Sequence, residues 1–238
     1  MWKTGVPQAA RPAIPGGLAV ALAVLLAGCG PRLTTPPPGQ MPAGFPEAYY
    51  REAATLGKRV LRVDARRSLV AITVRRGGTL ARLGHDHVVA SHDLRGWVAE
   101  DEGRTDIYLP LEALTVDEAE LRTAAGLNTP VSQDVAAGTR RNMLTTVLDA
   151  AHFPFALIHA TGHGTDPSIL DVEITLHGTA RLFKVPVSIG HQGGELVVSG
   201  RMSLRQSDFG ITPMSILGGA LQVQDGLEMR FRVVATGA

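Results

Sequence analysis

The stretch LEMRFRV at residues 227–233 places an apolar side chain at every odd position and a charged one at every even position. Successive side chains of a β-strand point to opposite faces of the sheet. This alternation is therefore typical of a strand with one face toward a core and the other toward solvent. We predict that Leu227, Met229 and Phe231 point inward from this strand.

The same alternation recurs along the chain and makes the expected fold predominantly β. Residues 105–111, 171–178 and 196–204 follow it, and residues 69–75 are apolar and rich in β-branched side chains. The inward positions predicted for two of these stretches are Val172, Ile174 and Leu176 in one, and Leu196, Val198 and Met202 in the other.

One segment departs from the strand pattern. Residues 132–149 carry apolar side chains at roughly helical spacing, Ser132 is a good N-cap residue, and Pro154 prevents continuation of a helix. A helix inserted among about eight antiparallel strands indicates a closed barrel. We therefore predict an all-β fold, an eight-stranded antiparallel, lipocalin-like barrel with a short helical insertion, and a β-sandwich is the alternative.

The N-terminus has the pattern of an export signal. Lys3 and Arg11 precede the apolar run LAVALAVLLA at residues 18–27, and the small-residue motif LAGC occupies residues 26–29. Ten helical residues extend only about 15 Å, about half of a hydrocarbon core, so we expect no membrane-spanning anchor here. We predict a cleaved signal peptide over residues 1–28.

The LAGC motif resembles the lipobox of bacterial lipoproteins. That resemblance implies transfer of a diacylglyceryl group to the Cys29 sulfur, cleavage before Cys29, and acylation of the new amine. The alternative is an apolar leader with a buried cysteine, which is disfavoured because Cys29 is the only cysteine and cannot form an intramolecular disulfide. Gly30 in place of Asp implies sorting to the periplasmic face of the outer membrane. The predicted partner is a lipid bilayer, bound through acylated Cys29.

The rest of the chain divides into a spacer and one domain. Residues 29–57 comprise the lipid-attachment cysteine and a proline-rich spacer, with a short amphipathic helix expected over residues 45–57. Residues 58–238 form the barrel domain, about 180 residues, which is enough for one hydrophobic core. The net charge is +1 and no basic block exceeds two residues, so we expect no nucleic-acid partner.

Six groups of short motifs follow one another along the predicted domain. They are LRVD (61–64) with SLV (68–70), RLG (82–84), LRG (94–96), RNML (141–144) leading to HFP (152–154), LHGTA (176–180) with VPV (185–187), and SDFGI (207–211). Their order and separations resemble the YceI-like family of periplasmic lipid-binding proteins over about residues 59–235. Arg67 departs from the family, whose members usually have histidine there. The resemblance implies an eight-stranded barrel that encloses an elongated apolar ligand, a polyisoprenoid chain in known members.

The resemblance and the alternating faces together predict a hydrophobic ligand inside the barrel. An apolar tunnel removes a hydrocarbon chain from water at about 25 cal/mol per Å² and needs no catalytic group. A barrel filled by its own side chains would show the same alternation, so a structural or stress-related lipoprotein without a ligand is an alternative. The predicted ligand-binding residues are Val172, Ile174, Leu176, Leu196, Val198, Met202, Leu227, Met229, Phe231, His85 and His87.

A histidine pair in the motif GHDH, at residues 84–87, is absent from ordinary family members. In an extended strand His85 and His87 would project on one face about 6.5–7 Å apart, where two imidazoles can share Zn²⁺ or Cu²⁺. A metal-binding envelope protein is therefore an alternative function. The pair would otherwise hydrogen-bond a ligand head group at the barrel mouth, belong to a turn, or be solvated. Candidates for a third metal ligand are His92, Asp86, His152 and His159, with Asp93 as a hydrogen-bond acceptor for His92.

Two further histidines follow strand patterns. His177 alternates with the apolar set at positions 172, 174 and 176, so we expect it to face solvent. His159 shares a strand face with Phe155 and Leu157 and is interpreted as a core histidine inside the barrel, where an imidazole needs a hydrogen-bond partner.

Sequence signatures of catalysis are absent. The chain has no G-x-S-x-G or H-E-x-x-H motif and no P-loop glycine pattern, and Cys29 would be consumed by lipidation. We therefore expect a binding protein rather than an enzyme, with no cofactor beyond an isoprenoid or fatty ligand.

Overall fold

The computed structural model describes residues 40–163 and 166–237. The predicted signal peptide, Cys29 and most of the proline-rich spacer lie outside these ranges. Within them, no helix combines the length and the apolar character needed to cross a bilayer.

The helices are α1 (Glu47–Thr55), α2 (Ala119–Ala124) and α3 (Gln133–Asn142), which continues as a π-helical turn at Met143–Val147. The strands are β1 (Val60–Val63), β2 (Leu69–Gly77), β3 (His87–Ser91), β4 (Arg95–Ala99), β5 (Arg104–Pro110), β6 (Thr115–Val116), β7 (Phe155–His163), β8 (Asp166–Leu176), β9 (Thr179–Gln192), β10 (Glu195–Arg205), β11 (Ser215–Ile216) and β12 (Leu221–Gly237).

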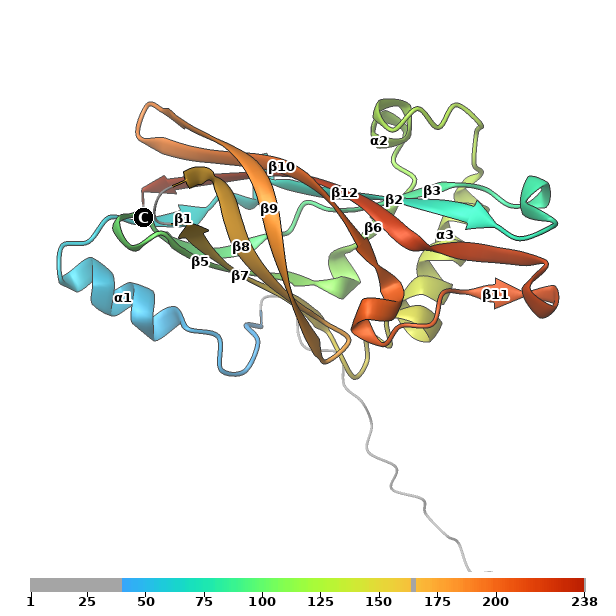
Figure 1. Ribbon diagram of the computed structural model, residues 1–238, viewed down its shortest axis with the longest axis horizontal. Coiled ribbons are helices and arrows are strands. Elements are labelled where there is room, and N and C mark those ends of the chain that lie inside the picture. The colour runs from blue at the N-terminus through green and yellow to red at the C-terminus, as the bar shows by residue number, and fades with distance from the viewer. Residues whose placement is uncertain (1–39, 164–165, 238) are drawn as a thin grey trace, which may run out of the picture. The chain divides into compact units, whose positions relative to one another are not determined.

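Eight strands close into an antiparallel barrel. Around the ring they follow the order β1-β4-β5-β7-β8-β9-β10-β12, and β12 returns to β1 through pairs such as Leu61 with Gly237. Figure 1 shows these strands winding around one another, with α1 on the outside and α3 toward one end. A sandwich would consist of two separate sheets, whereas this ring is one continuous sheet. The predicted fold class is therefore confirmed.

The sheet branches at β12, the longest strand. Residues Ala235–Gly237 pair with β1, and residues 222–232 pair with β2 instead. Strand β2 then pairs with β3, and β3 with β6, which has no further partner among the described strands. Strand β6 therefore ends this branch of the sheet, whereas β7 is paired on both sides, with β5 and with β8.

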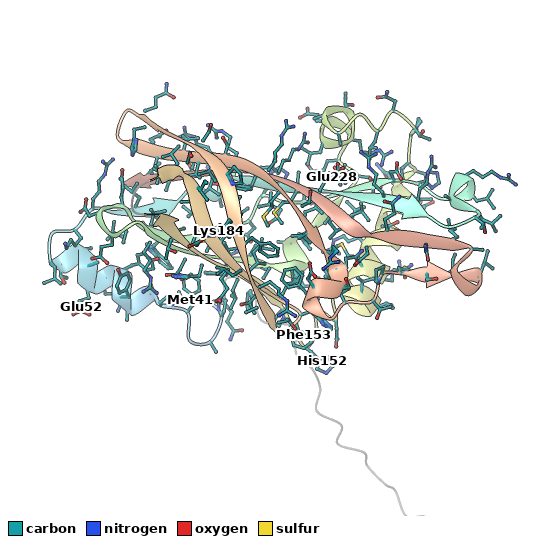
Figure 2. The ribbon with its side chains drawn as sticks, in the orientation of Figure 1. Met41, Glu52, His152, Phe153, Lys184 and Glu228 are labelled. Atoms are coloured by element: carbon teal, nitrogen blue, oxygen red, sulfur yellow. The ribbon has the colours of Figure 1, made fainter. Side chains whose placement is uncertain are left out.

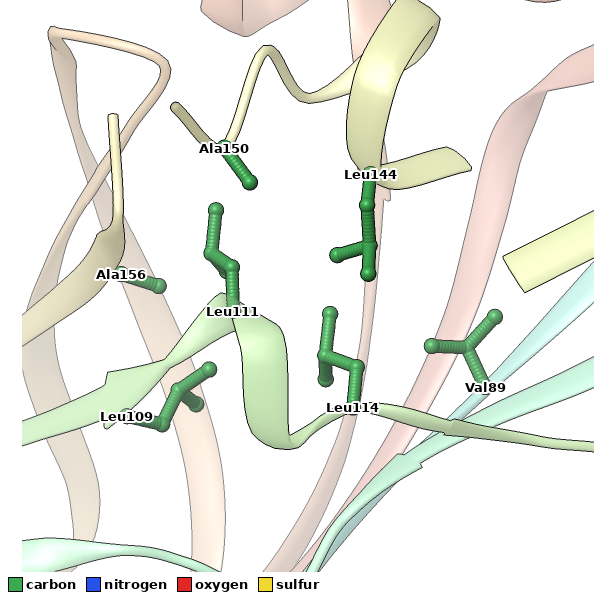
Figure 3. Close-up of a cluster of buried hydrophobic side chains, with 7 residues drawn as sticks. All are labelled: Val89, Leu109, Leu111, Leu114, Leu144, Ala150 and Ala156. Carbon is green, nitrogen blue, oxygen red and sulfur yellow. The ribbon is translucent and has the colours of Figure 1, made fainter. Parts of the chain in front are cut away.

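The predicted helical insertion packs across the β6 end of the barrel. Helix α3 begins where expected, since Ser132 accepts a hydrogen bond from the backbone N–H of Val135. The segment after α3 belongs to a buried cluster with the short connection between β5 and β6. Figure 3 shows Leu144 pointing toward Leu114 and Ala150 toward Leu111. Apolar packing thus covers the end of the branch at β6.

The inward faces of β10 and β12 lie in register with one another. Met202 lies opposite Met229, and Gly200 lies opposite Phe231. A Cβ atom at Gly200 would come within 2.7 Å of the Phe231 ring, so the glycine leaves the space that this ring occupies. The register brings the two predicted apolar faces together inside the barrel.

Helix α1 packs against the outer face of the barrel. Tyr50 is only 1% exposed, and its ring stacks on Trp97 with the centroids 6.0 Å apart. Phe45, just before the helix, meets the ring of Tyr108 edge-on at 4.8 Å. The domain boundary predicted at residue 58 therefore places α1 in the spacer, although this helix packs on the barrel. The outer face of β5, predicted to meet solvent, is buried at Asp106 and Tyr108 because α1 and its flanking residues cover it.

Candidate functional site

The barrel encloses a cavity of about 370 Å³ with an almost entirely apolar wall. Volumes of this order are typical of sites for small molecules. Each of the eight ring strands except β1 contributes side chains to it, as do β2, β3 and the segment around α3. The few polar side chains on the wall are His87, Ser91, Thr105, Thr139, Asn142 and Gln206.

All nine apolar residues predicted to bind a ligand line this cavity. The structure brings together the three sets from β8, β10 and β12, which are Val172, Ile174, Leu176, Leu196, Val198, Met202, Leu227, Met229 and Phe231. The structure places these side chains, and their part in ligand binding stays a prediction. His87 also lines the cavity, whereas His85 does not.

The predicted ligand-binding set omitted many other residues of the wall. Strands β2 and β7 contribute residues such as Ile72 and Ile158, and the segment after α3 contributes Met143. Phe209, which follows β10 in a short 3-10 helix, is fully buried. The strand pattern at residues 69–75 and the motif SDFGI were the available signals for two of these groups, but neither showed which side chains face inward.

The two ends of the cavity differ in their exposure. At the end formed by β4, β10 and β12, the lining residues Val98, Leu196 and Ala235 are buried. Around the end of the cavity near α3, Asn142 is exposed and His87 is partly exposed. The wall of the cavity is therefore more exposed near α3, where His87 lies.

A buried carboxylate holds the ring of His87 in place. The Nδ1 atom of His87 lies 2.6 Å from Oδ2 of Asp117, whose side chain is only 2% exposed. Asp117 also accepts hydrogen bonds from the Val88 backbone N–H, at 3.0 Å, and from the guanidinium of Arg122, at 2.6 Å. Burial alone would raise the pKa of Asp117, but the hydrogen bonds from His87, Val88 and Arg122 outweigh it and hold that pKa below its ordinary value. Asp117 is thus ionised beside the cavity.

A sequence model of the YceI-like domain matches residues 62–235, most of the chain. The chain belongs to the YceI-like family. This result confirms the family resemblance that the six groups of motifs predicted.

Two solved structures share the architecture of this YceI-like chain. One is a polyisoprenoid binding domain from Saccharophagus degradans implicated in plant cell wall breakdown, with 10% identity and a TM-score of 0.54 over 76% of this chain and 99% of that one. The other is BcnA from Burkholderia cenocepacia, with 14% identity and a TM-score of 0.50 over 73% of this chain and 99% of that one. At such identities the likeness shows the fold alone. No protein in the curated set is similar to this chain.

The histidine pair of this YceI-like domain is close together but has no third ligand beside it. The rings of His85 and His87 have centroids 6.3 Å apart, although only His87 belongs to β3. Asp86 instead accepts a hydrogen bond from the backbone N–H of Arg76 at 2.9 Å. Across residues 40–163 and 166–237, no three His, Cys, Asp or Glu side chains form a group that could hold a metal ion.

Two other proposed metal ligands each contact a separate carboxylate. His92 lies 3.1 Å from the carboxylate of Glu118, and His152 lies 2.7 Å from that of Asp149. The prediction that Asp93 orients His92 is wrong, because Asp93 instead accepts two hydrogen bonds from the Arg95 guanidinium, each at 2.7 Å.

Two histidine placements also need correction. His159 lies on the outer face of β7, half-exposed, because Ala156, Ile158 and Ala160 occupy the inner face. Its Nδ1 atom lies 2.7 Å from Oδ1 of Asp106, beneath α1.

His177 was expected to face solvent but is only partly exposed. It occupies the tight turn between β8 and β9 with a left-handed backbone, and its ring centroid lies 4.6 Å from that of Phe153. Figure 2 shows Phe153 at the surface of the barrel beside His152. The turn ends the strand one residue before His177, so the alternation that predicted its direction no longer applies.

Proposed function

We propose that this protein binds a long, isoprenoid-like or other lipid chain inside its barrel. The observation that carries the proposal is the enclosed apolar wall of a 370 Å³ cavity, which apart from His87 presents only aliphatic, aromatic and neutral polar side chains. Hydrocarbon is the chemistry that such a wall recognises. The fold shared with a polyisoprenoid binding domain supports the same ligand class.

The energetics favour a ligand with a long chain. Each methylene that leaves water for the cavity contributes about 0.8 kcal/mol, whereas association itself costs at least about 4 kcal/mol. Affinity should therefore increase with chain length until the cavity is filled. Nothing in this mode of binding requires a reacting group, so the proposal is binding and not catalysis.

The test obstructs the cavity by a substitution at one of its lining residues. Val198 lines the cavity from β10, so Val198→Trp should obstruct it. Leu182 lies on β9 outside the cavity and is 66% exposed, which makes Leu182→Trp the matched control. We expect native mass spectrometry of detergent-free protein to find lipid on the wild type and on Leu182→Trp but not on Val198→Trp. Absence of bound lipid from all three, together with no binding of added long-chain isoprenoids, would refute the proposal.

We also propose that the protein is anchored to the periplasmic face of a membrane, the outer membrane where one exists. The support is the LAGC motif at residues 26–29 with Gly30 after it. Two or more acyl chains hold a protein on a bilayer stably, whereas one chain does so only marginally. Cys29→Ser should abolish incorporation of labelled palmitate and move the protein from the membrane fraction to the soluble fraction. Labelled palmitate on the Cys29→Ser chain would exclude this cysteine as the attachment site.

A further inference from the structure

His87 differs in its chemistry from every other described side chain on the cavity wall. Among the described residues that line the cavity, it is the only one with an ionisable side chain. It is 14% exposed and lies at the end of the cavity near α3, so it meets both the apolar interior and solvent. A ligand whose chain fills the cavity from this end would leave its head group beside the imidazole.

The hydrogen bonds of His87 decide which ring nitrogen is available. An ionised carboxylate only accepts hydrogen bonds, so the 2.6 Å contact with Asp117 requires a proton on Nδ1. No described residue hydrogen-bonds Nε2 of His87. The second ring nitrogen is therefore presented with a fixed ring orientation.

The surroundings of Asp117 favour an anion at that nitrogen. Arg122 is buried and contacts Asp117 at 2.6 Å, so the negative charge of the carboxylate is already compensated. When both of its ring nitrogens carry protons, His87 presents a positive charge and an N–H donor at the wall of an apolar cavity, where electrostatic interactions are strong. Thr139 and Asn142 of α3 also line the cavity and offer hydrogen-bond donors.

The backbone at Asp117 supports a specialised role for this carboxylate. Its φ of 61° lies in the left-handed region, which non-glycine residues adopt infrequently, although Asp does so more often than most. Residues in this region persist where the surrounding structure fixes them. Here two side chains and one backbone group fix Asp117, and one of those side chains is His87.

We propose that Nε2 of His87 binds the acidic head group, a carboxylate or a phosphate, of a lipid whose chain occupies the cavity. This inference rests on the proposed lipid binding and adds to it the polar end of the ligand. It assigns to His87 a hydrogen bond and an ion pair with the head group, while Asp117 acts through His87 as a positioning residue.

The test compares probes that share one chain and differ in the head group. Hexadecanoate, hexadecyl phosphate and hexadecanol are titrated at about pH 6 into the chain lacking residues 1–29, which keeps every described helix and strand. Hydrogen bonds to charged groups are strong enough that the wild type should bind one or both acids at least about tenfold more tightly than the alcohol. His87→Leu should remove that preference and leave hexadecanol binding within about twofold.

His85→Leu is the matched control, because His85 neighbours His87 but does not line the cavity. It should keep the preference for acids. If His87→Leu does not fold, as judged by circular dichroism, His87→Gln provides the same comparison with a polar, uncharged side chain. An acid preference that survives substitution of His87, or wild-type protein that binds acid and alcohol equally, overturns the head-group inference alone. Wild-type protein that binds none of the three probes instead counts against the proposed lipid binding.

Discussion

The hydroxyl of Tyr50 donates a hydrogen bond of 2.7 Å to Oδ2 of Asp106, and this bond joins α1 to the outer face of β5. Asp106 also accepts hydrogen bonds from Nε of Arg104, at 2.9 Å, and from Nδ1 of His159, at 2.7 Å. Burial and the hydrogen bond to Asp106 raise the pKa of Tyr50 far above its ordinary value, so the hydroxyl keeps its proton. A helix outside the ring is thus tied to the barrel by a buried, charged network.

Removal of the Tyr50 hydroxyl should lower the free energy of unfolding, but the protein should remain folded. Tyr50→Phe keeps the buried ring and takes one of three side-chain donors from Asp106, so we expect the free energy of unfolding to fall by about 1–2 kcal/mol. Tyr49→Phe on the same helix removes a more exposed hydrogen bond, to Glu102, and should cost less. Urea unfolding measures both. Equal losses for the two variants would contradict a special role for the buried bond.

Asp106 should make the free energy of unfolding depend on pH. Burial alone would raise its pKa, but hydrogen bonds from Tyr50, Arg104 and His159 outweigh it and hold the pKa below its ordinary value. A lowered pKa in the folded state stabilises the protein above the unfolded pKa of about 3.9, and this stabilisation is lost as the pH falls through the folded pKa.

Asp106→Asn should therefore be less stable at neutral pH and should lose less stability between about pH 7 and pH 3 than the wild type. Asp134→Asn, on the exposed first turn of α3, serves as the control and should leave the pH dependence unchanged. Unfolding in urea at both pH values gives the comparison. Identical pH dependence in Asp106→Asn and the wild type would show that this carboxylate does not contribute.

Gly200 should tolerate no side chain. Val at this position would place Cβ 2.7 Å from the Phe231 ring and 2.8 Å from the carbonyl oxygen of Pro186, so Gly200→Val forces the ring or the strand to move. Overpacking of this kind costs about 1–3 kcal/mol. A Cβ atom at Gly190, in the neighbouring strand, would meet no atom within 4 Å, so Gly190→Val is the control. Thermal unfolding should separate the two variants, and a similar melting temperature would show that Phe231 rearranges freely.

The segment after α3 should stabilise the barrel around β6 and the start of β7. Leu144 is buried among Leu111, Leu114 and their neighbours, so Leu144→Ala should destabilise the protein by about 2–5 kcal/mol. Val135→Ala removes apolar atoms from a 40% exposed position of α3 and should cost much less. Hydrogen exchange of the β6 and β7 amides should accelerate in Leu144→Ala only. Unchanged exchange there would mean that this packing does not hold the two strands.

The inner faces of β8, β10 and β12 were predictable because each alternates apolar with polar side chains. Strand β7 lacks that contrast, since Phe155 and Leu157 on one face are as apolar as Ala156 and Ile158 on the other. On its outer face, the ring of Phe155 meets that of Tyr108 edge-on, with centroids 5.8 Å apart. The period of two shows that two faces exist, but it does not show which one is inside when both are apolar. His159 was therefore placed on the wrong side.

Local sequence patterns could not identify Asp117 as the hydrogen-bond partner of His87. His85 and His87 are neighbours in the chain and were recognised as a pair, whereas Asp117 lies in a loop that reaches His87 only because β6 pairs with β3. Arg122, on α2, then completes the group. No spacing rule links these positions, because their proximity depends on strand order.

The pairing of β1 with β12 has a consequence for how the protein is made. Leu61, in the first strand, meets Gly237, in the last, so the ring cannot close until nearly the whole chain is available. Contacts between such distant residues carry a high entropic cost of loop closure, and proteins dominated by them fold slowly. Because the chain is synthesised from its N-terminus, its apolar strands must remain unaggregated until β12 has been made. Removal of β12 from the C-terminus would take away the shared partner of β1, β2 and β10.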